Sequence, residues 1–246
     1  MGISLRRSLL IMSFVGFSTA LSGCYQSFTT SSTTRTEFQR QLTPTTIGFN
    51  GGTTEPIFEH NRSLSRLIPL VKKISKRYEV DWIFILALMK EESRFDYEAI
   101  SHRGAYGLMQ LMPITQVEVA ERLGVDEVES PTNNIRAGIY HLKLLKRSFE
   151  DCSVEDRFRL TLAAYNAGLS RVQDAQRIVE FLGSDPKSWN AVREALPLLS
   201  KRSYTLHEKI WAEGKPPSGY FGGARVTIAY VENALRNYDE YSLALK

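Results

Sequence analysis

Cysteine and histidine are scarce in this chain of 246 residues, which has two cysteines and four histidines. The histidines are His60, His102, His141 and His207, and none has metal-ligand spacing to another histidine or to a cysteine. Two cysteines are also too few for a small domain held together by disulfides. The sequence therefore predicts neither a metal site nor a disulfide scaffold.

The sequence also lacks alternating strand patterns with hairpin turns, internal repeats, and an apolar run long enough to span a bilayer. Its net charge is only +4, which suits an anionic polymer but gives no reason to expect a nucleic-acid partner. With 43% hydrophobic residues, the chain can form one globular domain with additional segments.

Residues 1–23 have the pattern of a secretory signal peptide. Arg6 and Arg7 form its positive region, and residues 9–21 have the length of an apolar signal core. The segment ends in Leu21-Ser22-Gly23-Cys24, and small residues before a cysteine resemble the lipobox of bacterial lipoproteins. We expect cleavage before Cys24 and lipidation of that residue; the alternative is an ordinary secretory signal followed by a chance cysteine.

Lipidation of Cys24 leaves Cys152 without an intrachain partner, and Cys152 is expected to be a small structural residue. In Gram-negative lipoproteins, an aspartate directly after the lipidated cysteine resembles a signal for retention in the inner membrane. Tyr25 stands at that position here, which implies the periplasmic face of an outer membrane. Residues 24–61 are rich in serine, threonine and glycine and cannot bury enough apolar surface to order themselves. They are expected to form a flexible tether ahead of a folded domain at 62–246.

From about residue 62 the apolar spacing is helical. The run Trp82–Arg94 is apolar on every side, so we expect a buried central helix with Asp81 as its N-cap. Pro113 should begin a helix that ends at Leu123, before Gly124, and Asn134 should cap the helix that follows. Further helices are expected around Leu70–Tyr78, at Arg157–Ala167, at Trp189–Leu199 and at Thr227–Tyr238. The fold class predicted is all-α.

The end of the predicted central helix carries two carboxylates, in Lys90-Glu91-Glu92-Ser93-Arg94-Phe95. A glutamate in this position lies at the mouth of an apolar core, where desolvation raises its pKa and keeps a proton available for general acid catalysis. Helical periodicity does not choose between Glu91 and Glu92. The alternative is a solvated or ion-paired carboxylate, which is common at helix ends.

Three blocks of the sequence resemble the soluble-lytic-transglycosylase family. The first runs from Glu92-Ser93-Arg94-Phe95 to Gly104-Ala105-Tyr106-Gly107-Leu108-Met109-Gln110-Leu111-Met112-Pro113. The second is Asn134-Ile135-Arg136-Ala137-Gly138-Ile139-Tyr140-His141-Leu142, and the third is Leu162-Ala163-Ala164-Tyr165-Asn166-Ala167-Gly168. The tail at 189–200 and 223–233 resembles the catalytic domain of the membrane-bound lytic murein transglycosylases of type F. The resemblance covers about residues 65–240 and implies a lysozyme-like all-α domain.

The resemblance also implies roles for individual residues. The acid directly before the serine is the catalytic one, so Glu92 is the expected catalytic residue and Glu91 replaces a common glutamine. The expected substrate-binding residues are Ser101, Gln110, Met112, Tyr165 and Asn166. Ser101 has the alternative of a turn cap, and Met112 and Tyr165 that of simple core residues. In one departure, Val226 stands where the family often has a glutamate.

The activity implied is cleavage of peptidoglycan between N-acetylmuramic acid and N-acetylglucosamine, with formation of a 1,6-anhydro end and without a metal or organic cofactor. Two alternatives remain. A goose-type-lysozyme-like muramidase would use the same acid with water as the nucleophile, and a non-catalytic lipoprotein would only bind the wall. The expected partners are glycan strands and, through the lipid anchor, a membrane.

Overall fold

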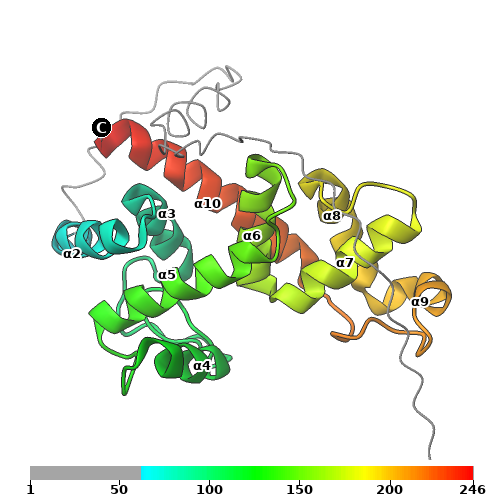
Figure 1. Cartoon of the computed structure of the whole chain (residues 1–246), viewed down its shortest axis with the longest axis horizontal. Coiled ribbons are helices and arrows are strands. Elements are labelled where there is room, and N and C mark those ends of the chain that lie inside the picture. Colours follow the sequence, from blue (N-terminus) through cyan, green and yellow to red (C-terminus); the bar gives the residue numbers. More distant parts are fainter. Residues whose placement is uncertain (1–61, 246) are drawn as a thin grey trace, which may run out of the picture. The chain divides into compact units, whose positions relative to one another are not determined.

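The structure, a computed structural model, describes residues 62–245, which form helices and contain no β-strand (Figure 1). The α-helices are α2 (Arg62–Tyr78), α3 (Trp82–Ser93), α4 (Pro113–Leu123), α5 (Pro131–Arg147), α6 (Val154–Ala167), α7 (Leu169–Phe181), α8 (Trp189–Ala195), α9 (Tyr204–Ile210) and α10 (Ala224–Leu245). Two short 3-10 helices, η1 (Leu196–Leu199) and η2 (Lys201–Ser203), lie between α8 and α9. The all-α prediction is confirmed for these residues. The predicted signal peptide, the tether and Cys24 lie outside them.

Helix α3 is the buried central helix that the sequence predicts. Residues 83–89 are all buried, because the helix packs against α2 and α10 and presents apolar side chains on every face. Asp81 is its N-cap, with the backbone N–H of Ile83 donating to Oδ1 at 2.9 Å. None of the helices in the described part of the chain is both long and apolar enough to cross a membrane.

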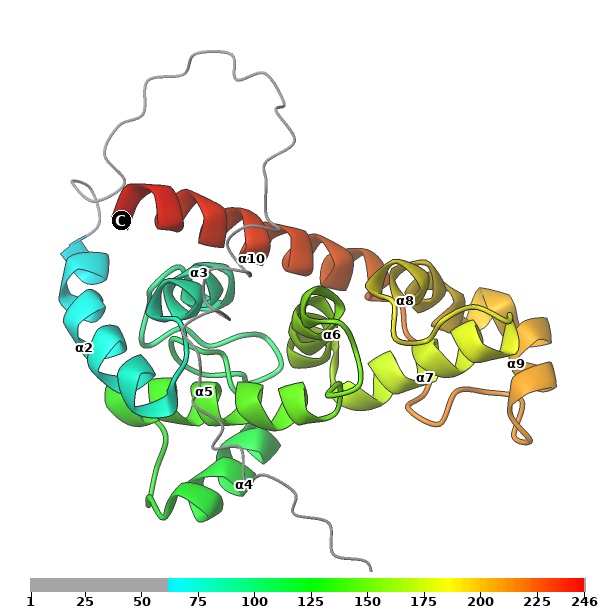
Figure 2. The ribbon, with the colours of Figure 1, turned by 45° about the horizontal axis from the view of Figure 1, so that its top comes forward.

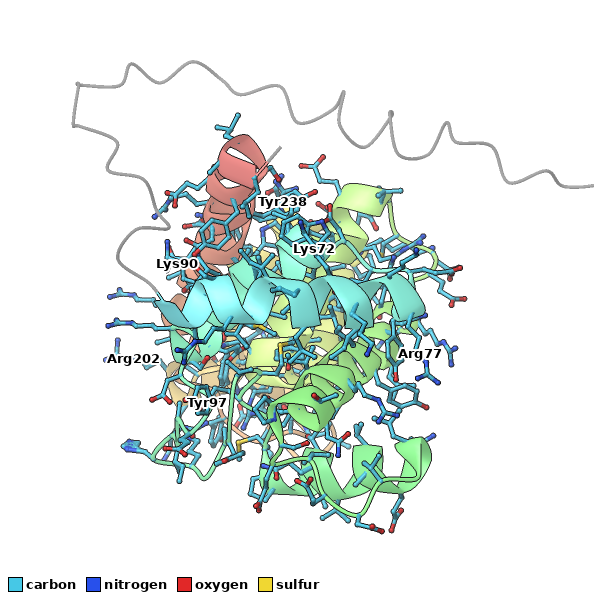
Figure 3. All side chains as sticks on the ribbon, turned by 90° about the vertical axis from the view of Figure 1, so that its left-hand side faces the viewer. Lys72, Arg77, Lys90, Tyr97, Arg202 and Tyr238 are labelled. Atoms are coloured by element: carbon cyan, nitrogen blue, oxygen red, sulfur yellow. The ribbon has the colours of Figure 1, made fainter. Side chains whose placement is uncertain are left out.

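Helix α10 lies along α3 and α6 and covers both (Figure 2). Phe84 of α3 packs between Phe158 of α6 and Tyr238 of α10, with ring centroids 4.5 and 6.2 Å away. Lys90, which like Tyr238 lies on the α10 side of α2 in Figure 3, pairs with Glu240 at 3.6 Å. The last helix thus completes the core beside the end of α3.

The start of α5 differs from the prediction. The N-cap is Ser130, whose Oγ accepts from the backbone N–H of Asn133 at 3.3 Å, and Pro131 occupies the first turn. The prediction that Asn134 is the N-cap is wrong. Asn134 lies inside the helix, is buried, and bonds to a distant loop instead.

Helices α7 and α9 were not predicted, and four helices besides α5 have limits that differ from the prediction. Helix α2 begins at Arg62, well before Leu70. Ser153 caps α6, which therefore begins at Val154, three residues before the predicted start. The predicted helix at 189–199 is divided, because Pro197 lies where the α-helix changes into η1. Helix α10 extends beyond both predicted ends.

Candidate active site

The end of α3 is followed by a sharp turn that begins a loop. Arg94 and Phe95 both have left-handed backbones, with φ of 53° and 69°. The buried Ser93 Oγ lies 3.2 Å from the carbonyl oxygen of Met89 and 3.1 Å from that of Leu108. One hydroxyl therefore links the helix end to the loop at 94–112.

Glu92 is half-buried in the last turn of α3, where it faces α10. The Tyr230 hydroxyl donates a hydrogen bond to Glu92 Oε1. Burial raises the pKa of Glu92 from its ordinary 4.5 to about 8; the bond from Tyr230 lowers it and the charge of Glu91 raises it. The predicted rise is confirmed, and Glu92 holds a proton at neutral pH.

Glu91 has different partners, although it is the neighbouring residue. Asn237 Nδ2 donates to Glu91 Oε1 at 2.6 Å, and Asn233 Nδ2 donates to Oε2 at 3.3 Å. Both glutamates thus face α10, one toward a tyrosine and the other toward two amides. The structure separates two carboxyl groups that helical periodicity left equivalent.

Tyr165 and Asn166 lie at the end of α6. The hydroxyl of half-buried Tyr165 donates to the Met109 carbonyl at 2.8 Å, and the pKa of Tyr165 is raised by burial and by the charge of Glu92. Asn166 is exposed, and its Oδ1 accepts from the Thr227 hydroxyl at 2.8 Å. Tyr165 is therefore close enough to Glu92 to respond to its charge, while Asn166 joins α6 to α10.

The loop at 94–112 packs closely against α5. Asn134 Oδ1 accepts from the Met109 backbone N–H at 2.9 Å, and Asn134 Nδ2 donates to the Tyr106 carbonyl at 3.1 Å. A Cβ at Gly107 would lie 2.6 Å from Asn134 Nδ2, and one at Gly138 would lie 2.6 Å from Met109 Cβ. These two glycines let the loop approach the helix.

Three more predicted site residues belong to this loop. Ser101 Oγ accepts from the backbone N–H groups of Arg103 and Ala105, so the residue acts as a turn cap. Gln110 Nε2 donates to two carbonyls of the same loop, each at 2.9 Å. Met112 is 39% exposed, directly before α4. Contact with a substrate stays a prediction for all three.

The sequence-based assignment missed Tyr230, Asn233 and Asn237 as site residues. They are spaced i, i+3 and i+7 on α10, so they share one face of that helix. A row of polar side chains on the core-facing side of an amphipathic helix was the available signal. It did not identify α3 as the partner, because 138 residues separate Tyr230 from Glu92.

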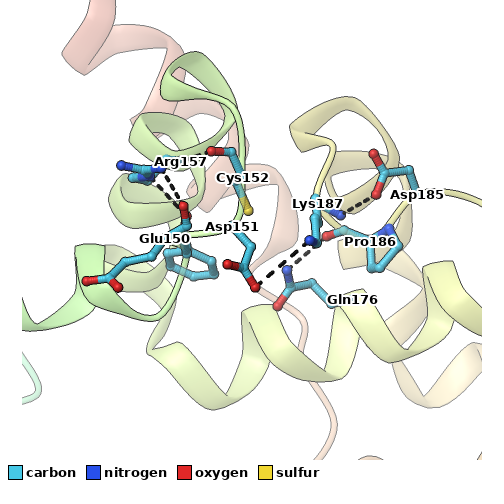
Figure 4. A network of polar contacts seen from close by, with 9 residues as sticks. Glu150, Asp151, Cys152, Arg157, Gln176, Asp185, Pro186 and Lys187 are labelled. Atoms are coloured by element: carbon cyan, nitrogen blue, oxygen red, sulfur yellow. Dashed lines mark hydrogen bonds and ion pairs between the residues drawn. The ribbon is translucent and has the colours of Figure 1, made fainter. Parts of the chain in front are cut away.

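Cys152 lies apart from these residues, in a charged network beside a hollow of about 470 Å³ (Figure 4). The thiol is buried and free, and burial raises its pKa, so it stays protonated and unreactive. Arg157 donates to the carbonyls of Phe149 and Cys152 at 3.0 and 3.1 Å. Within residues 62–245 there is no cluster of three or more histidine, cysteine, aspartate or glutamate side chains that could hold a metal ion.

Together these residues place the protonated carboxyl group of Glu92 against a tyrosine hydroxyl at the end of a buried helix, an arrangement suited to general acid catalysis. Residues 69–186 match the family model described as the transglycosylase SLT domain. This part of the chain therefore belongs to the transglycosylase SLT family.

Two relatives of known name are lytic murein transglycosylases. The chain is 38% identical to the membrane-bound lytic murein transglycosylase F of Desulfosudis oleivorans, over 72% of this chain and 36% of that protein. It is 34% identical to the membrane-bound lytic murein transglycosylase F 1 of Alkalilimnicola ehrlichii, over 68% and 34%. The chain thus spans about a third of the length of the curated relatives it matches. The solved structure of an inactive mutant of the lytic transglycosylase Slt from Pseudomonas aeruginosa aligns at 26% identity with a TM-score of 0.46, over 72% of this chain and 24% of that one.

Proposed function

We propose that this protein is a lytic transglycosylase that cleaves the β-1,4 bond between N-acetylmuramic acid and N-acetylglucosamine in peptidoglycan, using Glu92 and no cofactor. The observation that carries the proposal is the half-buried Glu92, whose pKa of about 8 leaves it protonated at neutral pH. A glycosidic bond needs a proton on its leaving oxygen before it breaks, and a carboxylic acid near this pKa can supply one.

In the first step, Glu92 gives its proton to the glycosidic oxygen, the bond from that oxygen to muramyl C1 breaks, and N-acetylglucosamine leaves as an alcohol. The muramyl N-acetyl group helps to stabilise the positive charge at C1. The hydroxyl of Tyr230 is already bonded to Oε1 and stabilises the carboxylate that forms. Because burial and the Glu92 charge raise the pKa of Tyr230, it stays a donor throughout.

In the second step, the muramyl C6 hydroxyl attacks C1, and Glu92 accepts its proton. The product is a 1,6-anhydro ring, and the enzyme regains its acid form. An intramolecular nucleophile has a high effective concentration, so no second carboxylate has to activate it. Both steps use one side chain in two protonation states.

The surroundings of Glu91 favour this mechanism over hydrolysis by a goose-type-lysozyme-like muramidase. An inverting hydrolase needs a second carboxylate to activate water, and most retaining ones need it as a nucleophile. Both oxygens of Glu91 are engaged by Asn233 and Asn237. The one acidic neighbour of Glu92 in the sequence is thus already committed to α10. A purely wall-binding lipoprotein is the third candidate, and it offers no reason for a protonated Glu92.

Ser101, Gln110, Met112, Tyr165 and Asn166 are proposed to line the glycan site. Exposed Met112 is suited to pack against a sugar face, and exposed Asn166 to bond a sugar substituent. Tyr165 is placed to act near the charge that develops in the reaction, since its pKa responds to Glu92. Ser101 and Gln110 use part of their hydrogen-bonding capacity to shape the loop and keep the rest for a ligand.

The proposed location is the cell envelope. Relatives named membrane-bound lytic murein transglycosylases support it in general terms. We further propose that residues 1–23 are a signal peptide and that Cys24 is lipidated and anchors the chain to the periplasmic face of an outer membrane. Residues 24–61 would then let the catalytic domain reach the nearby wall.

The test is mass spectrometry of the soluble products after purified peptidoglycan is incubated with the protein, with Glu92→Gln as the control. We expect 1,6-anhydromuramyl products from the wild type and at least about 1,000-fold less from the variant, because a general acid contributes 10²–10⁴-fold and its conjugate base is lost as well. Reducing-end products would assign the protein to the hydrolases. No products from folded wild-type protein would leave wall binding as the function.

A further inference from the structure

Glu91 and Glu92 meet the same face of α10 from adjacent positions. Side chains next to each other on a helix normally point about 100° apart and do not face one another. Here both glutamates accept hydrogen bonds from side chains within two turns of α10, namely Tyr230, Asn233 and Asn237. Glu91 is therefore held beside the acid without forming a hydrogen bond to it.

The two amides fix Glu91 in a form that accepts at both oxygens. An ionised carboxylate is an acceptor only, which matches two N–H donors at 2.6 and 3.3 Å. Neighbouring Lys90 does not neutralise it, since its ammonium group lies 3.6 Å from Glu240 and over the ring of Tyr241. The negative charge of Glu91 thus stays at the junction of α3 and α10.

Apart from Lys90, which pairs with Glu240, the groups around Glu92 supply no positive charge. The titratable groups near Glu92 or near its neighbours come from four helices: Glu91 and Lys90 from α3, Tyr230, Glu240 and Tyr241 from α10, Tyr165 from α6, and His141 from α5. The ring of His141 lies 5.4 Å from that of Tyr165. Burial lowers the pKa of His141 and so disfavours a cation there. Glu91 is the fixed charge next to the acid.

We propose that Glu91, anchored by Asn233 and Asn237, is a positioning residue whose fixed negative charge adds to burial in keeping Glu92 in its acid form. This inference rests on the proposed function of Glu92 as the acid. It assigns the second glutamate an electrostatic role, not that of a nucleophile or base. It also gives a reason for the two asparagines at the interface between α3 and α10, one of them buried.

The test is a carboxyl ¹³C NMR titration of the purified protein labelled at glutamate, with the Glu92 signal assigned by its loss in Glu92→Gln. In Glu91→Gln the titration midpoint of Glu92 should fall by about half a pH unit or more, as expected for removing a unit charge from the adjacent residue even under water-like screening. The pH at which glycan cleavage is lost on the alkaline side should shift downward by a similar amount, because Glu92 then ionises at a lower pH. Glu91→Asp, which keeps the charge, should restore most of the wild-type midpoint.

Glu121→Gln is the matched control, since it removes an equal charge from the exposed surface of α4. Its Glu92 midpoint should equal that of the wild type. If Glu91→Gln does not fold, Asn233→Lys sets a cation beside Glu91 and should also lower the midpoint. An unchanged midpoint in Glu91→Gln, or an equal fall in Glu121→Gln, would overturn the proposal. Wild-type protein that cleaves no glycan would instead refute the proposed function, while the titration still decides the role of Glu91.

Discussion

Two tyrosine–carboxyl pairs join α3 to α10, one at each end of α3. At the first end, Tyr238 donates to Asp81 Oδ2 at 2.9 Å, and at the last turn Tyr230 donates to Glu92. Asp81 is exposed and also accepts from the backbone of its own helix, whereas Glu92 is half-buried. The same pair of groups caps a helix at one end and holds a protonated glutamate at the other.

The difference comes from position on the helix and from solvent. The N-terminus of a helix carries partial positive charge and free N–H donors, which suit the negative charge of Asp81. The last turn offers carbonyl oxygens and partial negative charge, which oppose ionisation of Glu92, and burial adds to this effect. A carboxyl group at the end of a buried helix is therefore kept protonated by its surroundings.

The largest expected effect is that of Glu92→Gln on the free energy of unfolding at high pH. The pKa of Glu92 in the folded state, about 8, exceeds its ordinary 4.5, so the folded state binds more protons between these values. Stability that is present below about pH 4.5 is therefore lost as the pH rises through 8. After discounting for partial exposure, Glu92→Gln should be about 2 kcal/mol or more stabilising at pH 9, relative to its effect at pH 4. Urea unfolding at both pH values measures this, and equal effects would contradict it.

Next in size is the contrast between two matched tyrosine variants. Tyr230→Phe removes a donor that lowers the pKa of Glu92, so the high-pH limb of cleavage should move upward. Cleavage at neutral pH should fall about tenfold, because the carboxylate formed in the first step loses its hydrogen bond. Tyr238→Phe should leave the pH profile unchanged. Rates of muropeptide release between pH 5 and 9 measure both, and similar profiles for the two variants would count against the distinction.

The capping pair gives a smaller effect, on stability alone. Asp81→Ala should cost about 1 kcal/mol, since α3 loses its N-cap and Tyr238 loses its acceptor. Asp81→Asn should cost less, because asparagine is also a good cap. Thermal unfolding compares the two. Neither variant should shift the high-pH limb of cleavage, and a shift would mean that the ends of α3 are coupled.

The smallest effect is expected at Val226, one turn before Tyr230 on α10. This side chain is 67% exposed, so a glutamate placed there is largely screened by water. Val226→Glu should raise the Glu92 titration midpoint by less than about 0.3 pH unit. The carboxyl NMR titration measures it. A larger shift would show that this position is closer to the acid than its exposure indicates.

The central helix and the raised pKa of the glutamate at its end were predictable from sequence for local reasons. An apolar run with Asp81 before it defines a buried helix, and a glutamate at the end of such a run is desolvated. The choice of Glu92 over Glu91 as the catalytic residue comes from the family resemblance and stays a prediction. In the structure the two glutamates have different partners on α10, and residues so distant in sequence leave no periodic signal.

The errors also have physical causes. Asn134 was taken for a cap because asparagine is a frequent N-cap, but Ser130 followed by Pro131 is the stronger start signal. Gly168 does end α6, yet α7 starts directly after it, and the apolar spacing of Val172, Ala175 and Val179 indicated that helix. Local signals located the helix ends less well than the buried faces.

The most direct test of the account is the ionisation of Glu92 itself in the wild-type protein. The carboxyl ¹³C signal that disappears in Glu92→Gln should titrate with a midpoint near pH 8, the value of its pKa in the fold. Glycan cleavage should be lost as the pH rises through the same midpoint. A midpoint near 4.5 would mean that Glu92 is an ordinary solvated carboxylate and would contradict its role as the acid.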